Sequence, residues 1–219
     1  MGIMFSRDTQ MAKQSSAEPK KYHHGDLKQA LLDETARILR EEGESTLSLR
    51  RLASNLGVSR TAPYNHFENK DALLSAVAEE GFRRFEQAMK TVRQKHRDST
   101  GNEIMRALVQ AYLTFALNNP EYYDLMYDRK SWQDGAPTQS LAATARNILR
   151  KDTERLQKAQ KLGLISADVD VVYFDRIFWG TMHGISRLSL DGVYTDRVSV
   201  KKLGNNAADM LWQLLDPAK

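Results

Sequence analysis

The chain has 219 residues, of which 41% are hydrophobic and 27% are charged, and its formal net charge is +4 at pH 7. These values are typical of a soluble globular protein with one or two domains and a buried core. The absence of cysteine excludes disulfides, thiolate catalysis and cysteine-based zinc sites. No apolar run reaches the ~18–20 residues of a membrane span, and no signal peptide is visible. We therefore expect a cytoplasmic protein without a membrane partner.

The first 21 residues, 1–21, form a polar segment without hydrophobic periodicity, which predicts a disordered tail. Lys21 ends this tail, close to the first predicted helix. Its positive charge makes Lys21 a candidate for contact with a phosphate group. The alternative is a solvated tail without a partner.

The next segment predicts two helices that pack together. Over 26–42, apolar residues fall in two adjoining rows with helical spacing, and Gly43 ends this helix. A second helix is predicted over 49–56, where the apolar residues again form one stripe. Ser48 is its expected N-cap, and Gly57 is expected in the left-handed conformation that follows a helix end.

A third, short helix is predicted directly after this glycine. Ser59 is its expected N-cap and 60–66 its extent, so that two helices are joined by a short turn containing glycine. This is the geometry of a helix-turn-helix. Pro63 has no N–H, so we expect the Ser59 carbonyl to lose one hydrogen bond, at small cost so near the helix start.

The charge pattern of this segment favours a nucleic-acid partner. Residues 45–67 contain Arg50, Arg51 and Arg60 and no acidic residue. Because carboxylates would repel phosphates, a surface without acids is what binding to a DNA backbone requires.

The sequence from 57 to 70 resembles the TetR/AcrR-type transcriptional regulators. The matching residues are a Gly-Val-Ser turn at 57–59, a Tyr-x-His-Phe ending at 64–67, and Lys70 at the start of the next helix. The resemblance implies a three-helix DNA-binding domain over 22–69 and a double-stranded DNA operator as partner.

Side-chain chemistry suggests how this domain contacts DNA. Arg60, Thr61 and Asn65 are the expected contacts to base edges, because Arg pairs with guanine and Asn with adenine. Tyr64 and Lys70 are expected at phosphates, the latter at a helix N-terminus; a packing role is the alternative for Tyr64 and His66. Lys21 is expected at a phosphate or in the minor groove. The complete predicted set is Lys21, Thr46, Ser48, Arg50, Ser59, Arg60, Thr61, Tyr64, Asn65, His66 and Lys70.

The remainder of the chain, 70–219, predicts a larger helical domain. A long helix is expected over 70–95, with Asn69 as its N-cap. No segment shows the alternation of a strand, so the fold class is all-α with about nine helices. The further helices are predicted over 103–117, 121–127, 138–161, 169–190 and 198–214.

A second motif lies in the predicted helix over 169–190. Trp179, His183 and Gly184 resemble the Trp-x-x-x-His-Gly signature of one TetR-type ligand-binding subgroup. The resemblance implies a homodimer in which the last two helices form a four-helix bundle with a symmetry mate. Four residues near the end would otherwise form an exposed apolar patch: Leu211, Trp212, Leu214 and Leu215.

Aromatic residues concentrate in this second domain and predict a pocket for a small-molecule effector. Several hydroxyl groups and an indole N–H among them need partners if they are buried, and a pocket with aromatic walls and a few polar groups fits this pattern. Ordinary core packing is the alternative, and a lone histidine in an apolar helix, such as His183, is more often a hydrogen-bonded core residue, with ligand contact or dimer packing as the other roles. The predicted ligand-binding residues are Phe82, Phe85, Phe115, Tyr123, Met126, Tyr127, Trp132, Trp179 and His183.

No catalytic constellation is visible in the sequence. Local spacing assembles no serine, carboxylate and histidine set, and no glycine-rich phosphate loop is present. We therefore predict no enzyme activity, no cofactor and no metal site. The predicted function is a ligand-released transcriptional repressor that binds a palindromic operator as a homodimer. The alternative is an all-helical small-molecule-binding protein without specific DNA binding.

Overall fold

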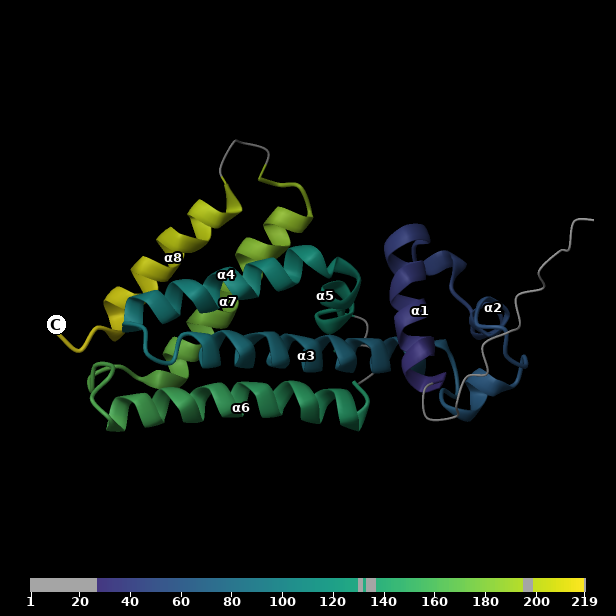
Figure 1. Cartoon of the computed structure of the whole chain (residues 1–219), viewed down its shortest axis with the longest axis horizontal. Helices are drawn as coiled ribbons and strands as arrows, with labels where there is room; N and C mark the ends of the chain where they lie inside the picture. Colours follow the sequence, from purple (N-terminus) through teal and green to yellow (C-terminus); the bar gives the residue numbers. More distant parts are fainter. Residues whose placement is uncertain (1–26, 130–131, 133–136, 195–198, 219) are drawn as a thin grey trace, which may run out of the picture.

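The computed structural model describes residues 27–129, 132, 137–194 and 199–218, and within these ranges all regular structure is helical, as predicted. Figure 1 shows a small part, with α1 and α2, and a larger bundle, which α3 joins. The predicted tail, including Lys21, lies outside the described residues. The α-helices are α1 Leu27–Glu42, α2 Leu49–Asn55, α3 Lys70–Lys95, α4 Gly101–Asn118, α5 Pro120–Met126, α6 Gln139–Lys161, α7 Val171–Leu190 and α8 Val200–Leu215. Two 3₁₀ helices, η1 Glu44–Thr46 and η2 Ala62–Asn65, complete the small part.

The first two helices begin and end where their capping residues predict. The Gly43 backbone after α1 has φ 81°, a conformation that favours glycine, and its N–H donates to the Ile38 carbonyl at 3.1 Å. The Ser48 hydroxyl accepts from the N–H of Arg51 at 3.2 Å and so caps α2. Both predicted caps are confirmed.

The long helix α3 belongs to both parts of the molecule (Figure 1). Asn69 caps it by accepting from the N–H of Ala72 at 2.9 Å, as predicted. At about 1.5 Å per residue it is about 39 Å long. It packs against α1 in the small part and against α4, α5 and α6 in the bundle. The predicted domain boundary at 69–70 therefore precedes a helix that both parts share.

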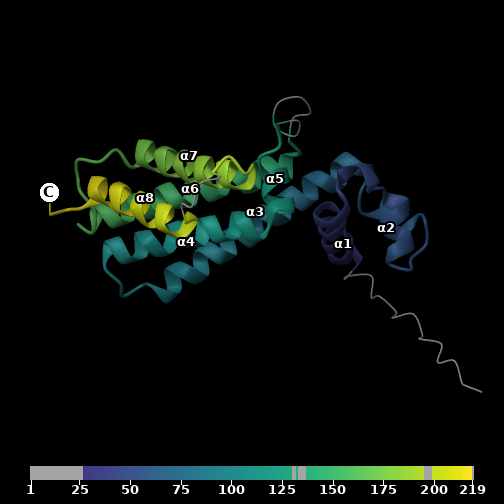
Figure 2. The ribbon, with the colours of Figure 1, turned by 90° about the horizontal axis from the view of Figure 1, so that it is seen from above.

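The bundle is built around α4, which packs against α3, α7 and α8, while α6 covers α3 and α7 (Figures 1 and 2). α4 begins two residues before the predicted start because Thr100 and Glu103 form a capping box. At Gly101, an added Cβ would lie 1.9 Å from the Trp212 ring. A side chain at this position would therefore force the Trp212 ring of α8 to move.

Two ion-pair groups connect α1 to the bundle. The Arg40 guanidinium donates to the carboxylate of Glu121 on α5, with Nε at 3.0 Å from Oε2, and Glu121 is buried. Asp33 of α1 pairs with Arg84 of α3 at 2.6 Å. The Arg84 guanidinium also lies 4.6 Å above the Tyr122 ring, in a cation–π contact. α1 is therefore attached to the bundle through ion pairs with both α5 and α3.

One face of α7 is apolar and exposed. Tyr173, Ile177 and Leu188 are 71%, 53% and 37% exposed. Gly180 and Gly184 lie on the same face by their spacing, and a Cβ added at either would meet no atom of the described chain within 4 Å.

On α8, Met210 and Leu214 are also exposed. The expected patch at the chain end needs correction, because Leu211 and Leu215 are buried within the chain and Trp212 packs over the start of α4. Among the described residues, no helix combines the length and apolar character that a membrane crossing needs.

Candidate DNA-binding surface and effector pocket

The turn after α2 has the predicted geometry. Gly57 has φ 66°, in the left-handed region that favours glycine. Its neighbour Val58 donates its N–H to the Ala53 carbonyl at 3.0 Å and packs against the core. The chain therefore reverses tightly and leads directly into the segment predicted to read DNA.

The predicted helix over 60–66 is not α-helical, and this expectation is corrected: it is the single 3₁₀ turn η2, flanked by turn residues. The cause is Pro63, whose ring nitrogen cannot donate a hydrogen bond. The Ser59 carbonyl accepts instead from the N–H of Ala62 at 3.0 Å, in the tighter 3₁₀ pattern. Ser59 therefore does not cap this segment as predicted, and its hydroxyl lies 3.2 Å from that of Thr61.

Most of the predicted DNA contacts lie exposed on this part of the surface. Phe67 and Pro63 are buried beneath them and fix the turn to the core. In the described ranges, Arg50 and Arg60 form no ion pair, which leaves their guanidinium groups available to phosphates or bases. The exposed members are Thr46, Ser48, Arg50, Ser59, Arg60, Thr61, Tyr64 and Asn65, and His66 and Lys70 are half-buried.

Two basic residues of this region already have acidic partners. The guanidinium of Arg51 contacts both carboxylate oxygens of Glu42, at 2.6 and 2.7 Å. The Lys70 ammonium donates to the Glu44 backbone carbonyl at 2.8 Å and lies 3.2 Å from the Glu44 carboxylate. Sequence reasoning missed the second pair because Glu44 lies just outside the acid-free segment 45–67.

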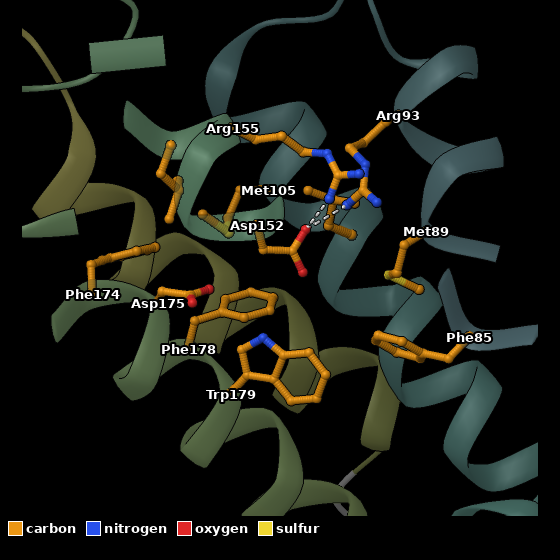
Figure 3. Close-up of a pocket in the computed structure, with 12 residues that line it drawn as sticks. Phe85, Met89, Arg93, Met105, Asp152, Arg155, Phe174, Asp175, Phe178 and Trp179 are labelled. Atoms are coloured by element: carbon orange, nitrogen blue, oxygen red, sulfur yellow. Dashed lines mark hydrogen bonds and ion pairs between the residues drawn. The ribbon is translucent and has the colours of Figure 1, made fainter. Parts of the chain in front are cut away.

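The bundle contains a cavity of about 120 Å³ between α3, α4, α6 and α7 (Figure 3). Of the predicted ligand-binding residues, Phe85 and Trp179 line it. The other lining residues were missed by the sequence analysis: Met89, Arg93, Met105, Leu108, Asp152, Arg155, Leu156, Phe174, Asp175 and Phe178. The spacing of Phe174 and Phe178 on one helix face was an available signal, whereas no local pattern brings α3 and α6 together.

The cavity has charged groups on one side (Figure 3). Asp152 of α6 accepts from Arg155 at 2.5 Å and lies 3.5 Å from the guanidinium of Arg93. Asp175 of α7 is buried, which raises its pKa, although the hydroxyl of Thr153 donates to it at 3.0 Å. An otherwise apolar cavity with charges on one side fits an amphipathic small molecule.

The remaining predicted ligand-binding residues form an aromatic cluster beside this cavity. Tyr112 connects the two, because its ring lies 5.7 Å from that of Trp179 and its hydroxyl 3.2 Å from that of Tyr123. The Tyr123 hydroxyl lies 2.9 Å from Nδ1 of His183. The residues outside the cavity lining are Phe82, Phe115, Tyr123, Met126, Tyr127, Trp132 and His183, and their binding role stays a prediction.

The polar groups of this cluster find partners within the protein. The indole N–H of Trp132 donates to the Met126 carbonyl at 2.8 Å. Burial raises the pKa of Tyr112 and of Tyr127, and burial together with the nearby Arg187 lowers the pKa of His183. These groups are therefore neutral near pH 7, as hydrogen-bonded core residues are.

No metal site accompanies these features in the described ranges, where no group of three or more His, Asp or Glu side chains could hold an ion. A short helix-turn-helix with exposed arginine and asparagine, joined by one helix to a bundle with a cavity, defines a DNA-binding transcriptional regulator.

Comparisons with known proteins identify its family. A model described as "Bacterial regulatory proteins, tetR family" matches residues 31–77, and one described as "Tetracyclin repressor-like, C-terminal domain" matches residues 105–211. The chain belongs to the TetR family of transcriptional regulators. Members of this family bind DNA operators and small-molecule effectors. This assignment supports the DNA-binding function predicted from the sequence.

Solved structures share the fold of this chain. A Rhodococcus sp. RHA1 protein of unknown function is 32% identical, with a TM-score of 0.78, over 90% of this chain and 98% of that one. A tetR-family regulatory protein from Rhodococcus RHA1 shares the fold at 15% identity, with a TM-score of 0.63 and coverage of 87% and 97%. FadR from Bacillus subtilis, solved with stearoyl-CoA, shares it at 14% identity, with a TM-score of 0.66 and coverage of 84% and 96%.

Proposed function

We propose that this regulator is a repressor that binds a palindromic operator as a homodimer and is released by a small molecule in the cavity. The observation that carries the proposal is the shared helix α3. Its start, with Lys70, lies beside the DNA-facing turn, and further along Phe85, Met89 and Arg93 line the cavity. A ligand that changes the position of α3 therefore changes the position of the DNA-binding part.

The exposed face of α7 and α8 supports the homodimer. Tyr173 and Ile177 on α7 and Met210 on α8 are more than half exposed, and apolar faces of this kind mark association sites. The space above Gly180 and Gly184 allows a partner helix to approach closely. In a symmetric dimer, two DNA-binding parts about 34 Å apart would enter successive major grooves.

Release by an effector requires that effector binding and operator binding are thermodynamically coupled. The coupling between effector and operator is typically about 1–3 kcal/mol, and it acts equally in both directions. Bound operator should therefore weaken effector binding by the same factor by which the effector weakens operator binding. Equal effector affinity with and without operator would contradict this mechanism.

Selection from a random DNA duplex pool, at low and at physiological salt, tests the DNA part of the proposal. We expect enrichment of a palindrome with half-sites about one helical turn apart. Weak binding that disappears as salt rises, without enrichment, would contradict it. The dimer is tested by sedimentation of Ile177→Asp, which should give monomers, beside Leu162→Asp as a matched control. Leu162 is 62% exposed in the turn that follows α6.

A further inference from the structure

Two guanidinium groups share one carboxylate at the charged side of the cavity (Figure 3). Arg155 and Asp152 both belong to α6 and form a close pair, whereas Arg93 comes from α3. Its guanidinium reaches the same Asp152 oxygen at 3.5 Å, which is longer than a hydrogen bond. The other acid that lines the cavity, Asp175, pairs with Arg176 outside the lining.

Arg93 lacks a close anionic partner although it is largely removed from water. Its side chain is 23% exposed, and within the described ranges its ion pair is the long one to Asp152. Burial lowers the pKa of Arg93, which reflects the desolvation of its charge. A buried or partly buried charge is stabilised by a nearby opposite charge with good hydrogen-bond geometry.

The neighbouring acids are already paired with other groups. Asp175 accepts from Thr153 and lies 2.9 Å from the guanidinium of Arg176. Glu86 of α3 pairs with Lys151 of α6 at 2.6 Å. The guanidinium of Arg93 is therefore available to bind an anion that enters the cavity.

The volume and apolar walls of the cavity limit the size of a ligand that can bind in it. Its volume of about 120 Å³ compares with the ~150 Å³ of an apolar cavity that accommodates benzene. The apolar walls come from Phe85, Met89, Met105, Leu108, Leu156, Phe174, Phe178 and Trp179. A single ring fits the apolar part of this space, and a short chain can extend from it to a polar group at the charged side, where the side chain of Arg155 is 41% exposed.

We propose that the effector is a small organic anion, with a ring-sized apolar body and a carboxylate-like head that binds Arg93. This inference rests on the proposed function, because it takes the cavity as the effector site. The head group would replace Asp152 as the anion nearest to Arg93. Binding would thereby weaken a contact between α3 and α6, the two helices that this ion pair joins.

Three probes with the same body and different head charges test the inference. They are 3-phenylpropanoate, 3-phenylpropanol and 3-phenylpropylamine, each titrated calorimetrically into the full-length protein. We expect the propanoate to bind at least about tenfold more tightly than the alcohol, since charge-assisted hydrogen bonds are the stronger kind. The amine should bind most weakly.

Variants assign the preference to particular charges. Arg93→Met should remove the advantage of the propanoate and leave the affinity for the alcohol unchanged. Asp152→Asn should increase propanoate affinity, because it removes the competing carboxylate. Arg150→Met is the matched control: it lies on α6, its side chain is 62% exposed and it pairs with Glu154, so probe binding should not change.

The outcomes separate this inference from the proposed function. Equal or tighter binding of the alcohol or the amine, or binding of none of the three probes, overturns the anionic effector. An unchanged propanoate preference in Arg93→Met overturns it as well. If the propanoate binds through Arg93 but leaves the affinity for the selected operator unchanged, the anion site is supported and effector release is overturned.

Discussion

The DNA-facing surface and the interior of the bundle place their polar groups in opposite situations. On the surface, Arg60, just before η2, and Asn65, at its end, are exposed to solvent. In the bundle, the hydroxyls of Tyr112 and Tyr123 and the ring of His183 bond to one another. An exposed polar side chain is available to an external partner, whereas a buried one is mainly occupied by its neighbours. Residue type therefore indicates function more reliably on the surface than in the interior.

The largest expected effect contrasts a buried tyrosine with an exposed one. Tyr112→Ala should lower the free energy of unfolding by about 3–5 kcal/mol, as removal of a large buried ring does, because Tyr112 is 1% exposed. Tyr64→Ala, at a residue that is 48% exposed, should change it by about 0.5 kcal/mol or less while weakening DNA binding. Chemical denaturation of both variants measures the contrast, and similar losses would contradict it.

A smaller expected effect, on DNA affinity, distinguishes residues that contact bases from residues that contact phosphates. Arg60→Ala should relax the preference at particular bases by about 1–3 kcal/mol. Lys70→Ala should weaken binding to all sequences alike and reduce the salt slope by about one contact. Affinities for selected and random DNA at several salt concentrations measure both. Arg51→Ala is the control, since Arg51 pairs with Glu42, and a loss of specificity in that variant would refute the assignment.

A still smaller effect concerns the pair between Lys70 and Glu44. Glu44→Gln should raise the affinity for all DNA sequences, because the ammonium no longer divides its interaction between a carboxylate and a phosphate. Exposed ion pairs are worth about 0.2–1 kcal/mol, so the gain should be no more than about fivefold. In a Lys70→Gln background, Glu44→Gln should increase DNA affinity by a smaller factor, because the ammonium through which part of the increase acts is absent. An undiminished gain there would show that Glu44 acts through general charge.

The smallest effect is a pH dependence of stability. Because burial lowers the pKa of His183 in the folded protein, the unfolded chain takes up the proton first as the pH falls. The stability is fully present above the unfolded value of about 6.5 and declines as the pH falls through that value towards the folded pKa. His183→Phe should flatten the unfolding free energy between pH 7.5 and pH 5. An unchanged slope would mean that other groups cause the dependence.

Local signals in the sequence predicted most of the helices and their ends. Ser48, Gly57 and Asn69 occupy the predicted caps because capping depends on residues a few positions apart. The missing N–H of Pro63 was expected to cost one hydrogen bond within an α-helix, whereas the segment is a 3₁₀ helix. A missing donor in a segment this short leaves too few i to i−4 hydrogen bonds for an α-helix.

The cavity could be predicted only in part. Its aromatic wall follows from composition: Phe85 and Trp179, which were predicted to bind a ligand, line it, and their binding role stays a prediction. The charged side arises because α3 and α6, about 60 residues apart in the chain, bring Arg93 beside Asp152. No spacing rule within one helix contains that information, and the same applies to Arg40 and Glu121 between α1 and α5.

If the proposed effector moves α3, the length of this helix enlarges the displacement at its DNA-binding end. From Phe85 to Lys70 the helix rises by about 22 Å. A tilt of about 8° around Phe85 would displace the start of the helix by about 3 Å, which is the full length of a hydrogen bond. A ligand no larger than one ring therefore needs to move its neighbours only slightly for contacts to bases to be lost. In the proposed mechanism, the length of α3 would thus convert a local repacking into a larger displacement at the turn predicted to contact DNA.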